Sequence, residues 1–125
     1  MKMAEKQITE TAQESESPVL EEQENGIVRL TLNRPKQFNS LSEAMLETLQ
    51  EKIRAIAENK EARLVILQGA GKAFCAGHDL KEMIETRKES YYKSLFQQCS
   101  RMMMTLNKLP QPVICLLYTS DAADE

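Results

Sequence analysis

The stretch Lys72-Ala-Phe-Cys-Ala-Gly-His-Asp-Leu80 decides how the whole sequence is interpreted. Gly77 allows the backbone a tight turn that other residues rarely adopt. Asp79 has the character of a helix N-cap, because its carboxylate can accept the free amide protons of a first helical turn. Backbone N–H groups at such a helix entrance can stabilise negative charge on an oxygen atom. We therefore expect the amide of His78 to face a ligand, at the start of a short helix over residues 80–84.

The residues before this stretch predict a strand, a helix and a second strand. Residues 27–32 alternate apolar and polar side chains, which is typical of a strand, and Pro35 interrupts the pattern. Ser40-Leu-Ser-Glu43 fits a capping box and predicts a helix that runs to about residue 58. The continuous apolar run Leu64-Val-Ile-Leu67 is typical of a buried strand in a parallel sheet. The order predicts a βαβ unit with a right-handed crossover.

A longer helix and a further strand are expected downstream. Apolar side chains recur at helical spacing over residues 90–108, and Pro110-Gln-Pro112 ends the pattern. Val113 and Ile114 then begin another apolar strand. We interpret the methionines of this helix as core filler, because Met adapts to irregular gaps. The apolar face of the helix comprises Tyr92, Leu95, Phe96, Cys99, Met102, Met103 and Leu106.

Three motifs in this order resemble those of the crotonase, or enoyl-CoA hydratase/isomerase, superfamily. Residues 26–41 are similar to its opening strand and its Asn-Arg-Pro-x-x-x-Asn-x-Leu turn. Residues 72–83 resemble its Ala-Phe-x-x-Gly-x-Asp-Leu/Ile-x-x-Met signature, and Leu109-Pro-Gln-Pro-Val-Ile114 resembles the lead-in to its third major strand. The resemblance implies an α/β fold, the N-terminal part of a crotonase-type ββα spiral, here truncated. It also implies a parent protein that assembles as a homotrimer or a hexamer.

The resemblance assigns roles to two segments. It implies that the backbone N–H of His78 is the first donor of an oxyanion hole, in which the negative charge of a thioester enolate is stabilised. It implies an acyl-CoA substrate, no other cofactor and no metal. Lys36 and Lys81 could contact the CoA phosphates as flexible point charges. The implied substrate- and CoA-binding residues are Lys36, Gln37, Phe38, Ala76, Gly77, His78, Asp79, Leu80 and Lys81.

The sequence divides into three parts. Residues 1–25 carry seven Glu against two Lys and few large apolar side chains, so we expect a disordered acidic lead-in. Residues 26–114 form the partial crotonase-like domain. We expect residues 115–125 to be a non-native tail, because the run from Cys115 resembles the codon-by-codon translation of a transposase-type sequencing adapter. The family's second donor lies on a Gly-rich turn after its third strand, and this tail contains no Gly.

Composition excludes several classes of function. A formal net charge of -3 gives no electrostatic basis for nucleic-acid binding, and no apolar run reaches the roughly 20 residues of a membrane span. Three widely spaced cysteines and a single histidine indicate reduced thiols and argue against a zinc site. No secretory or mitochondrial leader pattern is present, which favours a cytoplasmic protein, with the mitochondrial matrix as the alternative.

Two hypotheses of function follow. The first is a fragment of an acyl-CoA-processing enzyme, an enoyl-CoA hydratase or isomerase of fatty acid metabolism, with the 125 residues inactive on their own. The second is a non-catalytic module that binds acyl-CoA or pairs with other subunits through the apolar face of the long helix. Hydratase, isomerase and decarboxylase branches all remain open.

Overall fold

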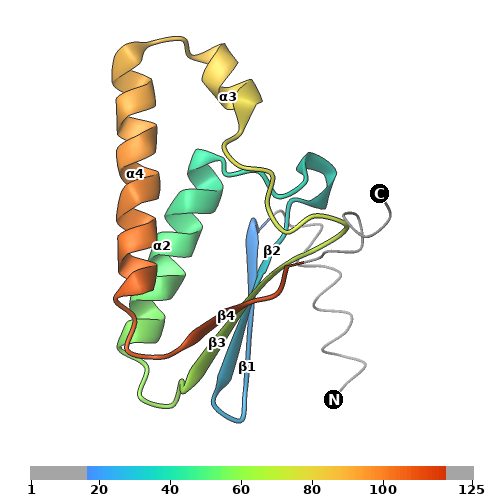
Figure 1. Cartoon of the computed structure of the whole chain (residues 1–125), viewed down its shortest axis with the longest axis vertical. Coiled ribbons are helices and arrows are strands. Elements are labelled where there is room, and N and C mark those ends of the chain that lie inside the picture. The colour runs from blue at the N-terminus through green and yellow to red at the C-terminus, as the bar shows by residue number, and fades with distance from the viewer. Residues whose placement is uncertain (1–16, 118–125) are drawn as a thin grey trace.

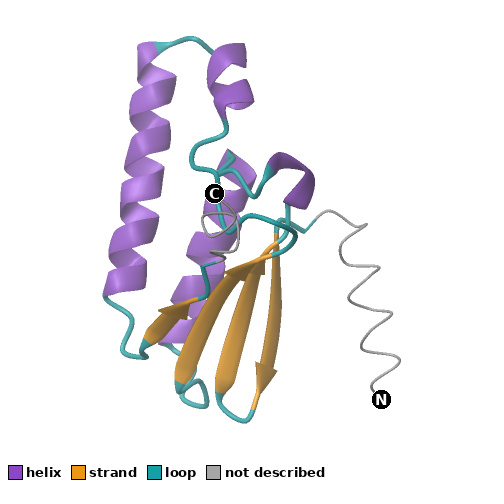
Figure 2. Cartoon of the chain, turned by 45° about the vertical axis from the view of Figure 1, so that its right-hand side comes forward, coloured by secondary structure: helices purple, strands orange, loops and turns teal. Residues whose placement is uncertain are grey.

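The computed structural model describes residues 17–117, which form a four-stranded sheet with helices on one face (Figure 1). In order across the sheet, the strands are β1 (Val19–Glu24), β2 (Ile27–Leu32), β3 (Leu64–Gly69) and β4 (Val113–Cys115). β1 is antiparallel to β2, whereas β2, β3 and β4 run parallel. The long helices α2 (Glu43–Ala57) and α4 (Glu89–Asn107) lie side by side against the sheet (Figure 2). The expected α/β class is confirmed.

The strand β1 corrects the expectation of a disordered lead-in. Val19–Glu24 pairs with β2 along its whole length, and Val19 is only 1% exposed. The two strands are joined by Asn25 and Gly26, whose φ angles are 55° and 82°. Asn-Gly is the preferred sequence for this two-residue hairpin turn, because both positions need positive φ. The acidic composition obscured this turn signal, and the expectation is wrong for Val19–Glu24; residues 1–16 lie outside the described part of the chain.

The predicted βαβ unit is confirmed, with one change at the start of its helix. The side chain of Ser42 accepts a hydrogen bond from the Met45 N–H at 3.1 Å, so Ser42 is the N-cap of α2 rather than Ser40. Alternate side chains of β2 and β3 point at the helices and are buried. Together with α2 they form the centre of the core, whose fully buried large side chains include Leu30, Met45, Leu46, Ile53, Ile56, Val28 and Val65.

The second crossover is longer and contains two helices. The short helix α3 (Leu80–Glu85) and α4 confirm the two helices expected after Asp79, and β4 confirms the strand expected at Val113. Of the expected apolar face of α4, Leu95 and Met102 are buried. Phe96 and Met103 are instead 47% and 50% exposed, so part of this face is open to solvent.

Gln111 ties the start of β4 to the end of α2. Its buried Nε2 donates to the carbonyl oxygens of Ile56 and Ala62 at 2.9 and 3.1 Å, and more weakly to that of Asn59 at 3.4 Å. Carbonyls at a helix C-terminus have no partner within the helix, so a side-chain donor here satisfies groups that would otherwise be buried without one.

Replacing Gln111 with Ala should destabilise the domain by about 1–3 kcal/mol, because buried carbonyls lose their donor. Urea unfolding followed by circular dichroism measures the change. Gln97→Ala, on the exposed side of α4, is the matched control and should change stability by no more than about 0.5 kcal/mol. Equal effects of the two substitutions would contradict this role of Gln111.

Candidate functional site

Two loops meet at the carboxyl ends of the parallel strands. β2 and β3 are paired so that their last residues, Leu32 and Gly69, lie opposite each other. The Asn-Arg-Pro turn follows β2, and the signature loop over residues 70–79 follows β3. Because parallel strands point the same way, the loops at their carboxyl ends gather at one edge of the sheet, where ligands commonly bind in α/β folds.

Asn39 joins the two loops. Its side chain is fully buried, with Oδ1 accepting from the Arg34 N–H at 2.7 Å. Its Nδ2 donates to the carbonyl oxygens of Ala70 and Ala73 at 2.9 and 2.8 Å. Asn39 has φ of 56°, a left-handed conformation that Asn tolerates better than most residues. Gly69 makes room for this contact, because a Cβ there would lie 2.9 Å from the Asn39 Nδ2.

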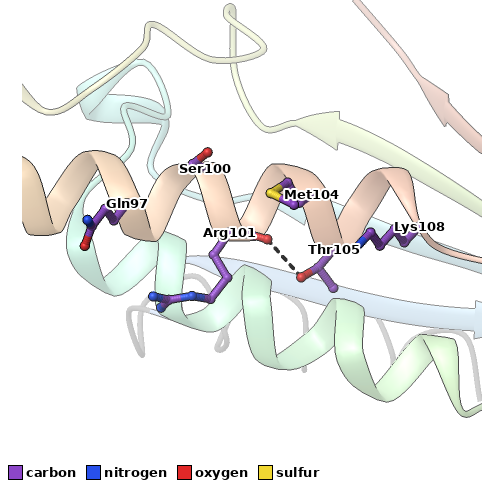
Figure 3. Close-up of a pocket in the computed structure, with 6 residues that line it drawn as sticks. All are labelled: Gln97, Ser100, Arg101, Met104, Thr105 and Lys108. Carbon is purple, nitrogen blue, oxygen red and sulfur yellow. Dashed lines mark hydrogen bonds between the residues drawn. The ribbon is translucent and has the colours of Figure 1, made fainter.

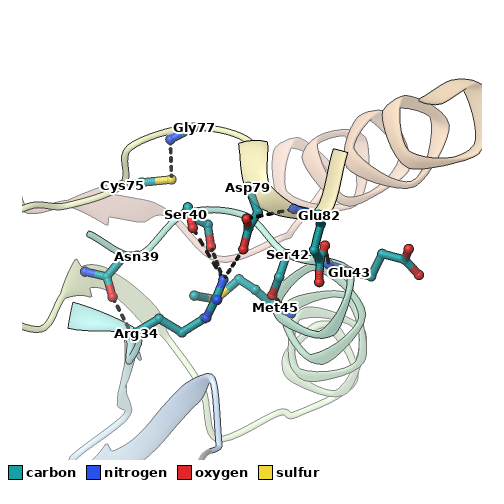
Figure 4. A network of polar contacts seen from close by, with 10 residues as sticks. All are labelled: Arg34, Asn39, Ser40, Ser42, Glu43, Met45, Cys75, Gly77, Asp79 and Glu82. Atoms are coloured by element: carbon teal, nitrogen blue, oxygen red, sulfur yellow. Dashed lines mark hydrogen bonds and ion pairs between the residues drawn. The ribbon is translucent and has the colours of Figure 1, made fainter. Parts of the chain in front are cut away.

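Arg34 and Asp79 form the second connection (Figure 4). The Arg34 Nη1 lies 3.1 Å from the Asp79 Oδ2 and also donates to the Ser40 carbonyl oxygen at 3.0 Å. The other Asp79 oxygen, Oδ1, accepts from the Glu82 N–H at 3.2 Å and caps α3, as the sequence predicts. Both carboxylate oxygens therefore have partners, one in the Asn-Arg-Pro turn and one in the helix that follows the signature loop.

Backbone hydrogen bonds place the loops edge to edge around His78. The Leu41 N–H donates to the Gly77 carbonyl oxygen at 2.6 Å, and the Asp79 N–H donates to the Leu41 carbonyl oxygen at 3.1 Å. This is a parallel bridge between Leu41 and His78, in which the N–H of His78 itself points away from Leu41. Within the described part of the chain, the His78 N–H donates to no acceptor.

The structure brings together the two segments that the sequence assigned to the site. Lys36 and Gln37 lie on an exposed 3₁₀ turn (Pro35–Gln37), and the Ala76 N–H donates to the Phe38 carbonyl oxygen at 3.0 Å. Two large apolar side chains of these segments are open to solvent: Phe38 is 55% exposed and Leu80 is 68% exposed. Of the remaining assigned residues, Asp79 is buried. The others are exposed or half-buried at the same edge: Ala76, Gly77, His78 and Lys81.

The backbone conformation at residue 77 requires glycine. Its φ is +98°, which L side chains rarely adopt, and no atom lies within 4 Å of the position that a Cβ would take. The space beside Gly77 is therefore open, which leaves room for a ligand close to the backbone of the turn.

The His78 side chain turns toward α4. Its ring centre lies 5.0 Å from that of Phe96 in an edge-on arrangement, and its buried Nδ1 has no hydrogen-bond partner. The ring therefore packs against an apolar neighbour, and this contact does not involve the backbone amide of His78.

Titratable groups around the site have shifted pKa values. Burial alone would raise the pKa of Asp79, but the Glu82 amide and the Arg34 guanidinium outweigh it, so the pKa lies below its usual value. Burial, together with the nearby Glu43 carboxylate, raises the pKa of Tyr91 to about 12. Burial also raises the pKa of the Cys99 thiol, with Cys75 acting in the same direction. At neutral pH Asp79 is thus charged, whereas Tyr91 and Cys99 on α4 are protonated.

Residues 17–117 contain neither a metal-binding cluster nor a membrane-spanning helix. No cluster of three or more His, Cys, Asp or Glu is arranged there to hold a metal ion. No helix in these residues has both the length and the apolar character to cross a bilayer. A hollow on α4 is lined by Gln97, Ser100, Arg101, Met104, Thr105 and Lys108 (Figure 3). The Thr105 Oγ1 donates to the Arg101 carbonyl oxygen at 2.9 Å.

Sequence reasoning missed the structural roles of Arg34 and Asn39. Both residues belong to the Asn-Arg-Pro motif, but nothing in their local pattern shows that they bond to residues 31–45 positions away. The one signal in the sequence was the residue type of Asn39, since Asn is enriched at left-handed positions.

Comparison with known proteins identifies the family. A sequence profile described as enoyl-CoA hydratase/isomerase matches residues 27–118. The chain belongs to this family. The human protein named enoyl-CoA hydratase domain-containing protein 3, mitochondrial, is 39% identical over 106 residues. The 1,2-epoxyphenylacetyl-CoA isomerase of Escherichia coli is 34% identical over 107 residues. The family expected from the three motifs is therefore confirmed.

The fold agrees with solved members of the family. A crystal structure of enoyl-CoA hydratase from Mycobacterium smegmatis matches with a TM-score of 0.79 and 48% identity, over 82% of this chain and 40% of that one. The chain covers 35% of the human protein and 38% of the E. coli isomerase, while 85% and 78% of the chain is matched. It thus spans little more than a third of the length of these relatives, as expected for a truncated crotonase fold.

The Arg34–Asp79 pair should make stability depend on acid pH. A carboxyl whose pKa is lowered by folding contributes stability that is complete above its unfolded pKa of about 3.9. This contribution is lost as the pH falls through the folded value, which lies below 3.8. Asp79→Asn should therefore be less stable than the native chain at neutral pH, and the difference should shrink below a pH of about 4. Urea midpoints at several pH values measure it, and a constant difference down to a pH of about 2 would contradict it.

Proposed function

We propose that this chain is the first part of an enoyl-CoA hydratase or isomerase of fatty acid metabolism, with the His78 N–H stabilising negative charge on the thioester oxygen. Reaction of an acyl-CoA thioester through an enolate or a tetrahedral adduct places that charge on the oxygen. One pre-aimed backbone donor can be worth about 3 kcal/mol in the transition state. The proposal is that this donor contributes to lyase or isomerase chemistry, with the CoA thioester as substrate and no further cofactor.

The uncommitted amide of His78 is the observation that carries the proposal. The neighbouring N–H groups of Ala76, Gly77 and Asp79 all have acceptors within the described residues. The His78 N–H has none among the described residues, whereas the amides on either side of it are bonded. It is also close to the start of α3, where helix amides favour negative charge. A thioester oxygen is the acceptor that fits a donor in this position.

The exposed segments beside the amide suit the rest of the substrate. Lys36 and Lys81 are exposed residues of the two segments that the Leu41–His78 bridge joins, and we assign both to the CoA phosphates. Phe38 and Leu80 offer apolar surface to the acyl chain or the adenine. These assignments extend the family resemblance to individual residues of this chain.

We also propose that residues 1–125 alone do not turn over substrate. The resemblance implies a second amide donor and acidic residues that move protons, and assigns none of these to residues 26–114. The proposed parent is a homotrimer or hexamer. The human relative is named as a mitochondrial protein, which favours the matrix alternative over the cytoplasm.

A non-catalytic pairing module is the second candidate, favoured by the exposed apolar side chains of α4. Phe96, Met103 and Met104 are 47%, 50% and 54% exposed, so three large apolar side chains of one helix contact solvent. Such side chains are typical of a surface that another chain or domain covers. Under this hypothesis α4 mediates assembly and the His78 amide has no catalytic role.

A chimaera can test the catalytic proposal. Residues 17–114 would replace the matching part of the Mycobacterium smegmatis enoyl-CoA hydratase, which is 48% identical. Hydration of crotonyl-CoA should be measurable in the chimaera. His78→Pro removes the N–H and should lower kcat by about 10²–10³ fold. His78→Ala keeps the N–H, is the matched control, and should lose far less.

Two results would contradict the proposal. A folded chimaera in which His78→Pro and His78→Ala have equal activity would exclude the amide as a donor. A folded, correctly assembled chimaera without hydratase or isomerase activity would favour the pairing module. Circular dichroism and gel filtration distinguish both results from misfolding.

A further inference from the structure

We propose that Arg34, Asn39 and Asp79, here called the polar clamp, are positioning residues that fix the direction of the His78 N–H. The inference rests on the proposed function for what that amide does. Asp79, which the resemblance also places among the substrate-binding residues, enters this proposal only through its contacts with Arg34 and the Glu82 amide. The three residues act through the backbone of the signature loop, which makes them positioning residues.

The signature loop has little else to hold it in place. Residues 70–79 form no helix and no strand beyond the single bridge at His78. Gly77 has open space at its Cβ position, and Ala76 is exposed. Phe74 and Cys75 pack only partly buried against the core. Apolar packing therefore anchors the middle of the loop but leaves the direction of its last amides undetermined.

The polar clamp grips the loop at both ends. Asn39 bonds to the carbonyl oxygens of Ala70 and Ala73, where the loop leaves β3. Arg34 bonds to the Asp79 carboxylate, where the loop enters α3. The Arg34 N–H in turn donates to the Asn39 side chain, so the two grips share one turn. His78 lies between fixed ends and beside the Leu41 backbone.

Burial makes these contacts stiff. Asn39 is 0% exposed and Asp79 is 8% exposed. A buried polar group that loses its partner is costly, so small rotations of the loop are resisted by several hydrogen bonds at once. The left-handed φ of Phe38 and Asn39 further restricts the turn that carries the clamp.

The ring of His78 is the competing anchor. It contacts Phe96 at 5.0 Å. Side-chain torsions separate this ring from the backbone, so the ring contact does not by itself set the direction of the amide. His78→Ala removes the ring contact and leaves the clamp, which separates the two explanations.

Nuclear magnetic resonance of the full ¹⁵N-labelled chain tests the proposal without any activity assay. Residual dipolar couplings report the direction of each N–H, and hydrogen exchange reports the Leu41 and Asp79 amides that form the bridge. Two variants weaken the clamp. Asp79→Asn keeps a helix-capping side chain but removes the charge, and Asn39→Gly keeps access to positive φ but removes the carboxamide. The matched control is Glu21→Gln, which removes the Lys52–Glu21 ion pair of 3.2 Å, away from the site.

Each clamp variant should change the His78 coupling by more than the spread of changes in β2 and β3. It should also speed exchange of the Leu41 and Asp79 amides at least tenfold. Glu21→Gln and His78→Ala should do neither. Unchanged His78 couplings in both clamp variants would overturn the proposal, as would a change in His78→Ala equal to theirs. If both variants unfold, Arg34→Lys supplies a milder test; unfolding there too would show that these residues hold the fold rather than one amide.

The outcome is independent of the catalytic test. A clamp that fails by resonance leaves the donor role of His78 standing if the chimaera responds to His78→Pro. If His78→Pro leaves the activity of the chimaera unchanged, the donor role is excluded. The residual dipolar couplings can still show that the polar clamp orients the amide.

Discussion

The in-register parallel pairing of β2 and β3 is the constraint on which the site depends. Because Leu32 and Gly69 lie opposite each other, the two following loops leave the sheet at the same height. Hydrogen bonds between the loops become possible only from that starting point. Gly69 then allows close approach, since a Cβ there would lie 2.7 Å from two carbonyl oxygens of the loop. A shift of one residue in this pairing would turn the core side chains of β2 outward and separate the loops.

Buried polar side chains of the site hold the backbone in place, and the proposed chemistry rests on a backbone group. The Asn39 side chain bonds to the Arg34 amide and to carbonyl oxygens of the signature loop. The Asp79 carboxylate bonds to the Glu82 amide and to the Arg34 guanidinium. The group proposed to act on substrate is the amide of His78, which every residue except proline would supply. Side chains that face the ligand can therefore differ between relatives while the donor stays in place, and the 39% identity to the human relative is compatible with a shared backbone arrangement.

The sequence predicted most of the regular elements because their signals are local. The apolar patterns of β2, β3 and α4 and the N-cap at Asp79 each need only a few neighbouring residues. β1 was missed because acidic composition outweighed the Asn25-Gly26 turn. Ser42 rather than Ser40 caps α2, and Leu41 between them pairs with His78 of the signature loop. The contacts of Arg34 and Asn39 span 31–45 residues and follow from the sheet register. The motif resemblance predicted which two segments form the site, but the polar contacts between them could not be predicted from local patterns.

A crystal structure of the chimaera with a bound acyl-CoA would test the central claim most directly. We expect the thioester oxygen to lie about 2.7–3.1 Å from the His78 nitrogen. Arg34, Asn39 and Asp79 should keep the contacts described above. A thioester oxygen bound elsewhere, or a His78 amide turned toward another protein acceptor, would contradict it.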